Sequence, residues 1–466
     1  DAEAGRMLEA FIAEMSGGAE LMLHHPVPQE VVLVHDAPWE GSGCGYHTVF
    51  RDGDLFRMYY KAWHLAPKQG KLERPHETFG AYAESEDGVH WTKPSLGLFE
   101  FEGSKENNIV WVGKGGHDFT PFKDTNPDCK PGEEYKAIAY GPDPHGAYAF
   151  KSSDGIHWEF LQDAPILTEG AFDTQNLAFW DAVRAEYRAY IRDFADGVRG
   201  IRTATSKDFR TWTEPVWIEY PGAPTEALYT NQIKPYYRAP HLFVGFPSRY
   251  VERDWSPSME ALPNPEHRHL RSSSSKRYGT AITDALFMTS RDGLRFKRWG
   301  EAFLRPGPER PDQWAYGDNY IAWHAVETPS TLTGAPNELS LYATESYWTG
   351  DGSALRRYTL RLDGFVSAHA PLAGCEIVTK PLVFAGAALE LNFATSAAGN
   401  IRIEIQDADS TPIDGFALAD APEIFGDAVA RIAPWKDARD LAALAGTPVR
   451  LRFVMKDADL YAFRFR

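Results

Sequence analysis

The sequence predicts an all-β protein in which a five-bladed β-propeller is followed by a C-terminal β-sandwich. Three observations predict it. A seven-residue motif recurs four times, at intervals of 67, 54 and 84 residues. Helical periodicity nearly disappears after Gly17-Gly18, and apolar and polar residues alternate in several runs of segment 362–466. Repetition at such intervals is typical of blades, and alternation is typical of strands with one buried face.

A short helix is predicted at the N-terminus. Met7, Leu8, Phe11, Ile12 and Met15 would share one helical face, and the glycine pair after them would end the helix. We therefore expect a helix and a lead-in over residues 1–37, ahead of the propeller.

The repeated motif has the form S-x-D-[GF]-x-x-[WF] and begins at Ser85, Ser152, Ser206 and Ser290. Its Asp-Gly pair favours a hairpin turn, and its last residue would cap that turn. Strand-like runs rich in aromatic residues precede each copy, so three strands, a hairpin and a fourth strand would form one blade. A unit near 318–361 keeps the strands without the motif, which predicts five blades over 38–361.

The C-terminal segment has a different sequence pattern. The runs 389–393, 401–405 and 449–454 alternate apolar and polar residues, as strands with one buried face do. We expect a β-sandwich over 362–466 that serves as a structural cap on the propeller.

Composition excludes several classes of function. The net charge of −17 argues against nucleic acid or an anionic membrane as the partner, and no apolar run approaches 18 residues. The three cysteines are far apart and form no CxxC pair, which argues against a disulfide framework and a cysteine-based zinc site. We expect no required cofactor, although axial Asp and Asn side chains could hold a structural Ca²⁺. The expected location is periplasmic or extracellular.

Polar residues gather where the innermost strands are predicted to start, and functional sites of propellers usually lie at that axial mouth. Carboxylates from different blades that meet in one cavity suit glycosidic cleavage, because one must donate a proton while another acts ionised. Asp and Asn are also common caps of such turns, which is the structural alternative. The candidates are Asp124 and Asn126 in blade two, Asp173, Gln175 and Asn176 in blade three, Glu226 and Asn231 in blade four, Asp318 and Asn319 in blade five, and Glu40 with His47 in blade one.

Cations cluster in the loops predicted on the same face. Segment 249–281 holds six Lys or Arg residues and four carboxylates, within a chain of −17. Arginine at a cavity mouth suits a carboxylate or sulfate group of a substrate, and the alternative is a solvated lid. The candidates are Arg249 and Arg268 in this loop and Arg192 in blade three, and the blade-one loop adds Lys68, Lys71 and Arg74. Tryptophans near the mouth, Trp39 and Trp63 among them, could stack on a sugar, although most should be core.

These residues resemble motifs of the five-bladed propeller glycosidases of glycoside hydrolase families 32, 43 and 68, closest to bacterial family-32-N-terminal-like proteins. Phe172-Asp173 is similar to the family's Arg-Asp-Pro strand, whose Asp stabilises the transition state. Thr225-Glu226 is similar to the site of the family's acid/base Glu, and Phe122-Lys-Asp124 is a further match to Arg-Asp-Pro. The family's blade-one segment with the nucleophilic Asp is absent, since Cys44–His47 occupy that stretch.

The resemblance therefore implies an exo-acting glycoside hydrolase. Glu226 would be the general acid, Asp173 the transition-state stabiliser, and Glu40 or Asp124 the base or nucleophile. The sugar would be furanosidic or anionic. A polysaccharide lyase, with His47 or Tyr46 as base near Arg249, and a non-catalytic glycan-binding propeller are the alternatives. The substrate-binding residues would be His47, Arg192, Arg249, Arg268, Asn176, Asn231, Asp318 and Trp39.

Overall fold

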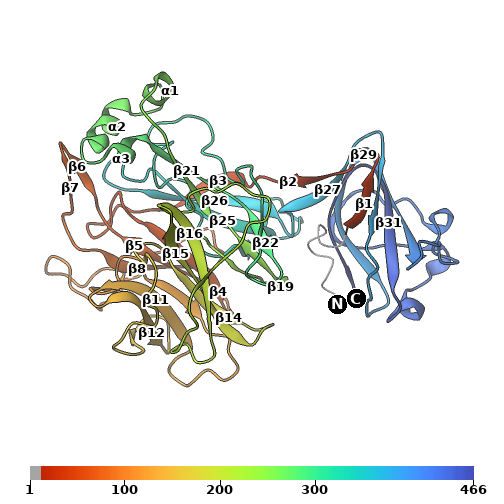
Figure 1. Ribbon diagram of the computed structural model, residues 1–466, viewed down its shortest axis with the longest axis horizontal. Helices are drawn as coiled ribbons and strands as arrows, with labels where there is room; N and C mark the ends of the chain where they lie inside the picture. The colour runs from red at the N-terminus through yellow and green to blue at the C-terminus, as the bar shows by residue number, and fades with distance from the viewer. Residues whose placement is uncertain (1–11) are drawn as a thin grey trace.

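Five antiparallel four-stranded sheets form a β-propeller in the computed structural model, which describes residues 12–466 (Figure 1). The predicted five blades are thereby confirmed. Blade I contains β4 (Gly45–Asp52), β5 (Leu55–Ala62), β8 (Phe79–Ser85) and β9 (Ile109–Trp111); blade II contains β10 (Thr120–Lys123), β11 (Tyr135–Pro142), β12 (His145–Ser152) and β13 (Glu159–Phe160). Blade III contains β14 (Leu177–Asp181), β15 (Glu186–Ala195), β16 (Val198–Ser206) and β17 (Val216–Trp217); blade IV contains β18 (Lys234–Tyr236), β19 (Ala239–Gly245), β22 (Met288–Ser290) and β23 (Lys297–Arg298). Blade V contains β24 (Val326–Thr328), β25 (Glu338–Glu345), β26 (Ala354–Arg361) and β3 (Val27–Val34).

Blade V is completed by a strand from the N-terminal part of the sequence. β3 forms its outermost strand and pairs antiparallel with β26. Arg357 of β26 donates two hydrogen bonds to the carboxylate of Glu30, at 3.0 and 3.1 Å. The propeller therefore uses residues that lie upstream of the predicted start at residue 38.

The predicted N-terminal helix is wrong in the part that the structure describes. Ile12–Ser16 forms strand β1, which pairs with β28 (Cys375–Thr379), and Glu20–Leu23 forms β2, which pairs with β27 (Val366–Ala370). Met7, Leu8 and Phe11 lie outside the described residues. A short helix is marginal in water, whereas a sheet edge offers partners to every second backbone group. The glycine pair does form the expected break, with φ of 68° and 86° between β1 and β2.

The C-terminal body is one curled sheet rather than a sandwich of two separate sheets. Its seven strands are β1, β2, β27, β28, β29 (Leu389–Asp407), β30 (Asp427–Ile432) and β31 (Val449–Phe465). The predicted runs 389–393 and 401–405 are parts of one 19-residue strand, which follows the 17-residue β31 through a register shift between Thr395 and Asn400. Because these long strands pass through the whole body, the sheet curls into a half-barrel around its apolar core (Figure 1).

The repeated Ser-x-Asp motif forms the hairpins between the third and fourth strands of blades I to IV. In blade I, the amide of Gly88 donates to Ser85 Oγ at 2.9 Å, and the amides of Val89 and His90 donate to Asp87 Oδ1 at 2.8 Å. Burial acts to raise the pKa of Asp87, but the imidazole of His90 and these amide donors together hold it well below its ordinary value. The same bonds recur in the other three copies, so the motif stabilises the turn in each of the four hairpins.

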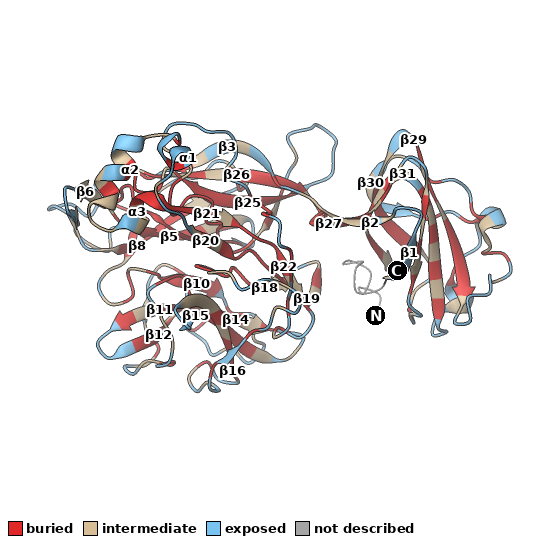
Figure 2. Ribbon diagram, turned by 45° about the horizontal axis from the view of Figure 1, so that its top comes forward, coloured by how far each residue is buried: buried red, intermediate tan, exposed pale blue. Residues whose placement is uncertain are grey.

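A helical insertion lies between β20 (Ser248–Glu252) and β21 (Ala281–Ala285), which form a separate two-stranded sheet in the connection between β19 and β22 of blade IV. It contains α1 (Pro257–Glu260), α2 (Pro265–Ser272) and α3 (Lys276–Thr280), and it contacts the hairpin of β6 (Ala66–Lys68) and β7 (Lys71–Glu73) from blade I. Figure 2 shows exposed residues on these helices, most of all on α1, and all three also contain buried residues. The described residues also form 3₁₀ turns at Leu418–Asp420, Lys436–Ala438 and Ala442–Leu444. Among residues 12–466, no helix has the length and apolar character to cross a membrane.

Candidate functional site

The loops that precede the innermost strands share one face of the propeller with the helical insertion, and we call this face the mouth. The Ser-x-Asp hairpins lie on the opposite face, because each blade's strands alternate in direction. Buried side chains close the axis beneath the mouth. Gln232 donates from its amide nitrogen to Gln175 Oε1 at 2.8 Å and to the carbonyl of Ile321 at 2.7 Å, and Gln175 donates to the carbonyl of Tyr46 at 3.0 Å.

A cavity of about 580 Å³ opens at the mouth between blades I, II and III, and we call it the mouth cavity. Three carboxylates from three different loops line it: Glu77 before β8, Asp143 after β11, and Asp173 before β14. All three residues are exposed to solvent. The remaining lining residues are Trp63, Arg74, Thr78, Gly113, Lys114, Gly115, His117, Tyr140 and Pro142.

Asp173 is oriented by Arg192. The carboxylate, whose side chain is 68% exposed, forms an ion pair with the guanidinium of Arg192, whose side chain is only 4% exposed. Arg192 is in turn held 5.3 Å from the ring centre of Tyr229, and its backbone amide donates to Asn176 Oδ1 at 3.1 Å. The predicted residues Asp173, Arg192 and Asn176 therefore lie together, with only the carboxylate presented to the cavity.

Trp63 holds a second cation at the cavity wall. The guanidinium of Arg74 lies 5.3 Å from the indole centre, and no carboxylate of residues 12–466 lies within ion-pairing distance of it. His117 packs edge-to-face on the same indole at 5.5 Å. Burial lowers the pKa of this imidazole well below its ordinary value, with nearby Lys61, Arg74 and Arg192 acting in the same direction, so His117 is neutral at neutral pH.

Glycine brings the loop of blade II against blade I. A Cβ atom at Gly116 would lie 2.4 Å from the carbonyl oxygen of Thr78, which no side chain could accept without backbone movement. The close approach places His117 on the wall that Thr78 and Glu77 share.

Lys61 lies beneath this wall as a buried cation. Its Nζ is 4.3 Å from the ring centre of Tyr46 and 4.7 Å from that of Trp63, and it donates to Tyr347 Oη at 3.2 Å. Burial lowers the pKa of Lys61 to about 7. The folded state therefore releases this proton at a lower pH than the unfolded state does.

We expect Lys61→Met to stabilise the protein at neutral pH. Between about pH 7 and the ordinary lysine pKa the unfolded state holds one more proton than the folded state, so the Lys61 contribution to stability increases as pH rises through this range. The difference in melting temperature between variant and wild type should be largest at pH 7 and smaller at pH 10. A variant that is less stable at both pH values would mean that the contacts of the ammonium with the three rings outweigh its desolvation.

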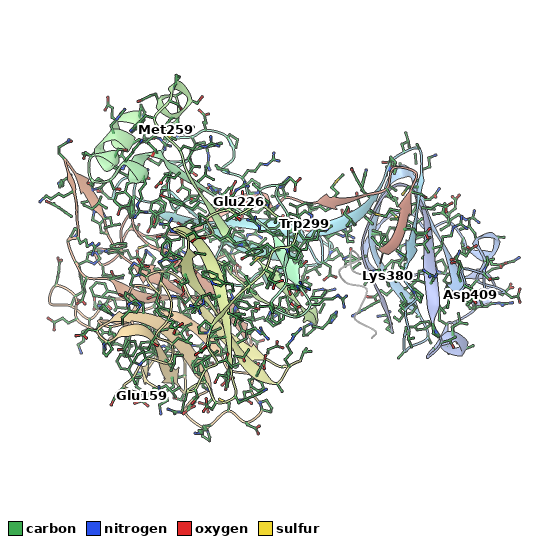
Figure 3. The ribbon with its side chains drawn as sticks, viewed as in Figure 1. Glu159, Glu226, Met259, Trp299, Lys380 and Asp409 are labelled. Carbon is green, nitrogen blue, oxygen red and sulfur yellow. The ribbon has the colours of Figure 1, made fainter. Side chains whose placement is uncertain are left out.

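Glu226, the predicted general acid, lies at a different cavity. Arg249 Nη1 contacts its Oε1 at 3.0 Å and Arg298 Nη1 contacts its Oε2 at 2.7 Å, while Arg249 also binds Asp284 through two nitrogens. The cavity is about 710 Å³ in volume and lies at blade IV. Figure 3 shows Glu226 within the propeller body, below Met259 of the helical insertion. A general acid has to hold a proton for a leaving group, whereas guanidinium groups occupy both oxygens of Glu226.

The two predicted bases are buried in hydrogen-bond networks away from the mouth cavity. Asp124 follows β10 on the hairpin face, where its fully buried carboxylate accepts from Lys136 Nζ at 2.5 Å and Tyr187 Oη at 2.6 Å. Glu40, also fully buried, accepts from Tyr60 Oη at 2.5 Å and Lys93 Nζ at 2.6 Å. The structure brings neither of them to Asp173.

The side chains of the remaining predicted binding residues form hydrogen bonds within the protein. His47 Nε2 bonds to His35 Nε2 at 3.0 Å, and Trp39 donates to Asn108 at 2.6 Å. Arg268 donates to the carbonyls of Pro263, Gln313 and Trp314. Asn231 Oδ1 accepts from the Ile233 amide at 3.2 Å, and Asp318 accepts from the amides of Ala315 and Tyr347 at 2.9 and 3.0 Å. Burial raises the pKa of Asp318 to about 7.

The predicted start of blade II lies about five residues too late. Its innermost strand has only four residues and contains Pro121, so the residues before it are His117 and Asp118 instead of Phe122 and Asp124. Asp118 is fully buried and accepts from the Tyr140 amide at 3.0 Å. Glu77 and Asp143 carry no motif, and only the topology shows that their loops meet Asp173. Among the described residues, no group of three or more His, Cys, Asp or Glu side chains could hold a metal ion.

No family model and no curated protein matches this sequence. Solved structures that match include an N-acetylgalactosamine deacetylase from F. plautii in complex with blood group B trisaccharide, at 14% identity and a TM-score of 0.42, over 75% of this chain and 95% of that one. An α-L-arabinofuranosidase from Fusarium graminearum in complex with an iminosugar inhibitor matches at 10% identity and a TM-score of 0.41, over 72% and 98% of the two chains. A fructofuranosidase from Schwanniomyces occidentalis complexed with fructosylnystose matches at 11% identity and a TM-score of 0.39, over 95% and 96%.

Glycoside hydrolases are thus among the solved structures that this protein is similar to, as its motifs predicted. At these identities the likeness concerns architecture, so the site has to be interpreted from its own side chains.

Proposed function

We propose that the protein is a glycoside hydrolase that cleaves a terminal, acidic sugar in the mouth cavity. The observation that carries this proposal is that Glu77, Asp143 and Asp173, from the loops of three blades, line one cavity. Hydrolysis of a glycosidic bond needs one carboxyl group that protonates the leaving oxygen and another that acts as base or nucleophile. Three carboxylates on separate loops provide both roles on different sides of a bound sugar.

Asp173 is our candidate for the carboxylate that acts at the sugar's anomeric carbon. Its ion pair with the buried Arg192 fixes its orientation, and a fixed geometry is what a nucleophile, base or transition-state stabiliser requires. Glu77 and Asp143 are the candidates for the proton donor, because they reach the same cavity from other loops. The closed axis below the mouth supports an exo mode of action, since a polysaccharide has no exit beneath the cavity.

Arg74 is our candidate for recognition of an acidic group on the sugar. Its guanidinium group lies over the indole ring of Trp63, and it has no acidic partner among residues 12–466. The three arginines that the sequence suggested, Arg192, Arg249 and Arg268, already bind carboxylates or carbonyls of the protein. An unpaired guanidinium at a cavity suits the bidentate binding of a carboxylate or sulfate.

We expect Arg74→Ala to raise KM at least about tenfold for a uronate-containing or sulfated substrate and to change KM little for its neutral counterpart, because only the acidic substrate loses a charged hydrogen bond. Steady-state kinetics with matched acidic and neutral aryl glycosides measures this difference. Lys71→Ala, in the same loop, is the control for loss of surface charge, since Lys71 is paired with Glu73 at 2.8 Å. Equal changes in KM for both substrates would exclude Arg74 from recognition.

A polysaccharide lyase is the second candidate function, and one observation favours it. The neutral imidazole of His117 and the unpaired guanidinium of Arg74 line the same cavity, and a lyase needs a base beside a cation that neutralises a uronate. The base predicted from the sequence differs, because His47 and Tyr46 are buried away from Arg249.

A product screen tests both functions. The protein is incubated with neutral furanosides and with uronate-containing or sulfated glycans, and the released sugars are separated by chromatography with ultraviolet detection. A single saturated monosaccharide from an acidic glycan supports the hydrolase, and an unsaturated product that absorbs in the ultraviolet supports the lyase. Binding of glycans without any product would support a non-catalytic propeller.

A further inference from the structure

A third cavity, of about 370 Å³, lies at the propeller axis on the hairpin face, between the inner strands of blades I, IV and V. We call it the axial cavity. Its walls are mostly apolar, and Lys234 and Gln232 lie at its inner end, next to the plug that separates it from the mouth. The apolar lining residues are Phe50, Pro235, Tyr236, Tyr237, Val244, Phe246, Ala325 and Val326.

Lys234 is a cation without an acidic partner. Its Nζ donates to His324 Nδ1 at 3.2 Å and lies 5.7 Å from the ring of Trp323, and no carboxylate of residues 12–466 lies within ion-pairing distance of it. An ammonium group has three N–H donors, so two remain after the bond to His324. Burial of a charge in apolar surroundings is costly unless the charge is paired.

Gln232 adds a hydrogen-bond acceptor to the axial cavity, whereas Lys234 is a donor. Its amide nitrogen is committed to Gln175 Oε1 and to the carbonyl of Ile321, which fixes the direction of its side chain. Its Oε1 is buried and has no hydrogen-bond donor among the described residues. The inner end of the axial cavity thus offers an ammonium group for an anion and a carbonyl oxygen for a hydroxyl.

The other titratable and charged side chains around the cavity do not neutralise Lys234. Glu327 accepts hydrogen bonds from Tyr237 Oη at 2.7 Å and from Asn337 at 2.9 Å. Arg51 donates to the carbonyl of Gly53, and Tyr236 donates to Asp363. His324 is neutral at neutral pH, because burial lowers its pKa well below the ordinary value.

From this arrangement we infer that the axial cavity binds a small organic acid that has an apolar body and a hydroxyl group beside its carboxylate. The carboxylate pairs with the ammonium of Lys234, the hydroxyl donates to Gln232 Oε1, and the apolar body fills the space between Phe50, Tyr237 and Phe246. This site is separate from the mouth cavity and does not depend on the proposed hydrolase activity.

The pH dependence of binding follows from Lys234. Burial lowers the pKa of this amine to about 7, so the free protein loses the proton near neutral pH, and a bound carboxylate favours its return. Binding should therefore take up a proton at pH 8 and exchange none at pH 5.5.

Titration calorimetry of the full-length protein tests the inference with 3-phenyllactate, 3-phenylpropionate and 3-phenyllactamide as probes. At pH 6 we expect 3-phenyllactate to bind at least about tenfold more tightly than the neutral amide, and more tightly than the acid without a hydroxyl. Lys234→Met should lower the affinity for 3-phenyllactate at least about tenfold. Lys114→Met, which removes a lysine from the mouth cavity, should leave the affinity unchanged.

Calorimetry of the wild-type protein also tests the site, and it does so even if the Lys234→Met variant does not fold. Titrations at pH 8 in HEPES and in Tris, whose ionisation enthalpies differ, should reveal uptake of one proton. Failure of all three probes to bind, equal affinity for the acid and the amide, or loss of binding in Lys114→Met and not in Lys234→Met would overturn the inference.

Discussion

Asp173→Asn is expected to lower turnover by at least about a hundredfold and to leave the fold intact. An amide cannot act as nucleophile or base, and loss of such a group costs on this scale or more. Asn still offers an oxygen to Arg192, so the ion pair is replaced by a hydrogen bond and the loop before β14 keeps its anchor. Turnover on the substrate found in the product screen measures the effect, and circular dichroism checks the fold.

Glu226→Gln is the matched comparison for Asp173→Asn. Both substitutions remove one carboxylate charge that is paired with arginine, but only Asp173 lines the mouth cavity. We expect Glu226→Gln to retain turnover within about fivefold and to lower stability, because it leaves Arg249 and Arg298 less well compensated. The reverse ranking would restore Glu226 as the general acid and move the catalytic site to the cavity at blade IV.

Trp323→Ala should destabilise the protein by about 3–5 kcal/mol, the usual cost of deleting a fully buried aromatic side chain. Trp323 has no exposed surface and sits at the axis, where several blades meet. Its indole nitrogen donates to the carbonyl of Ile233 at 3.0 Å, and its backbone pairs with His47 and Val49 of blade I. The substitution would thus open a void where the inner strands converge.

Denaturant unfolding followed by tryptophan fluorescence and by circular dichroism measures this loss. Trp217→Ala is the control, because Trp217 lies in the outermost strand of blade III and is 40% exposed. We expect a change of less than about 1 kcal/mol for the control. A small change for Trp323→Ala would mean that the axis repacks freely and contributes little to the stability of the propeller.

The blades could be predicted from the sequence because their turns use local chemistry. Ser85, Asp87 and their counterparts accept hydrogen bonds from amides only two or three residues away, so neighbouring residues in the sequence suffice to form the hairpin. Even the blade III copy, where Phe209 replaces Gly with φ of 62°, keeps the same bonds. The pairing of Ile12–Ser16 with β28 depends instead on residues more than 350 positions away, which local periodicity cannot reveal.

The candidate site was harder to predict for a similar reason. The sequence predicts Asp173 as a site residue, and this residue precedes β14 and lines the mouth cavity. The four-residue β10 obscures the start of blade II, so the sequence prediction there is Asp124 instead of His117. Carboxylate chemistry alone does not separate Glu226 from Asp173, because the arginines that bind Glu226, Arg249 and Arg298, lie 23 and 72 residues downstream of it. Which carboxylate is presented to a cavity is therefore decided by tertiary partners.

The closure of blade V has a consequence for synthesis of the protein. Glu30 and Arg357 are bonded although 327 residues separate them, so β3 leaves the ribosome early and finds its partner strand only when the propeller is almost complete. Until then its backbone donors and acceptors form an unpaired strand edge that can pair with other nascent polypeptides. Pairing over such a separation is also slow, because a long loop must close first. Truncation before residue 354 would make that exposure permanent, and such fragments should aggregate instead of folding as four-bladed propellers.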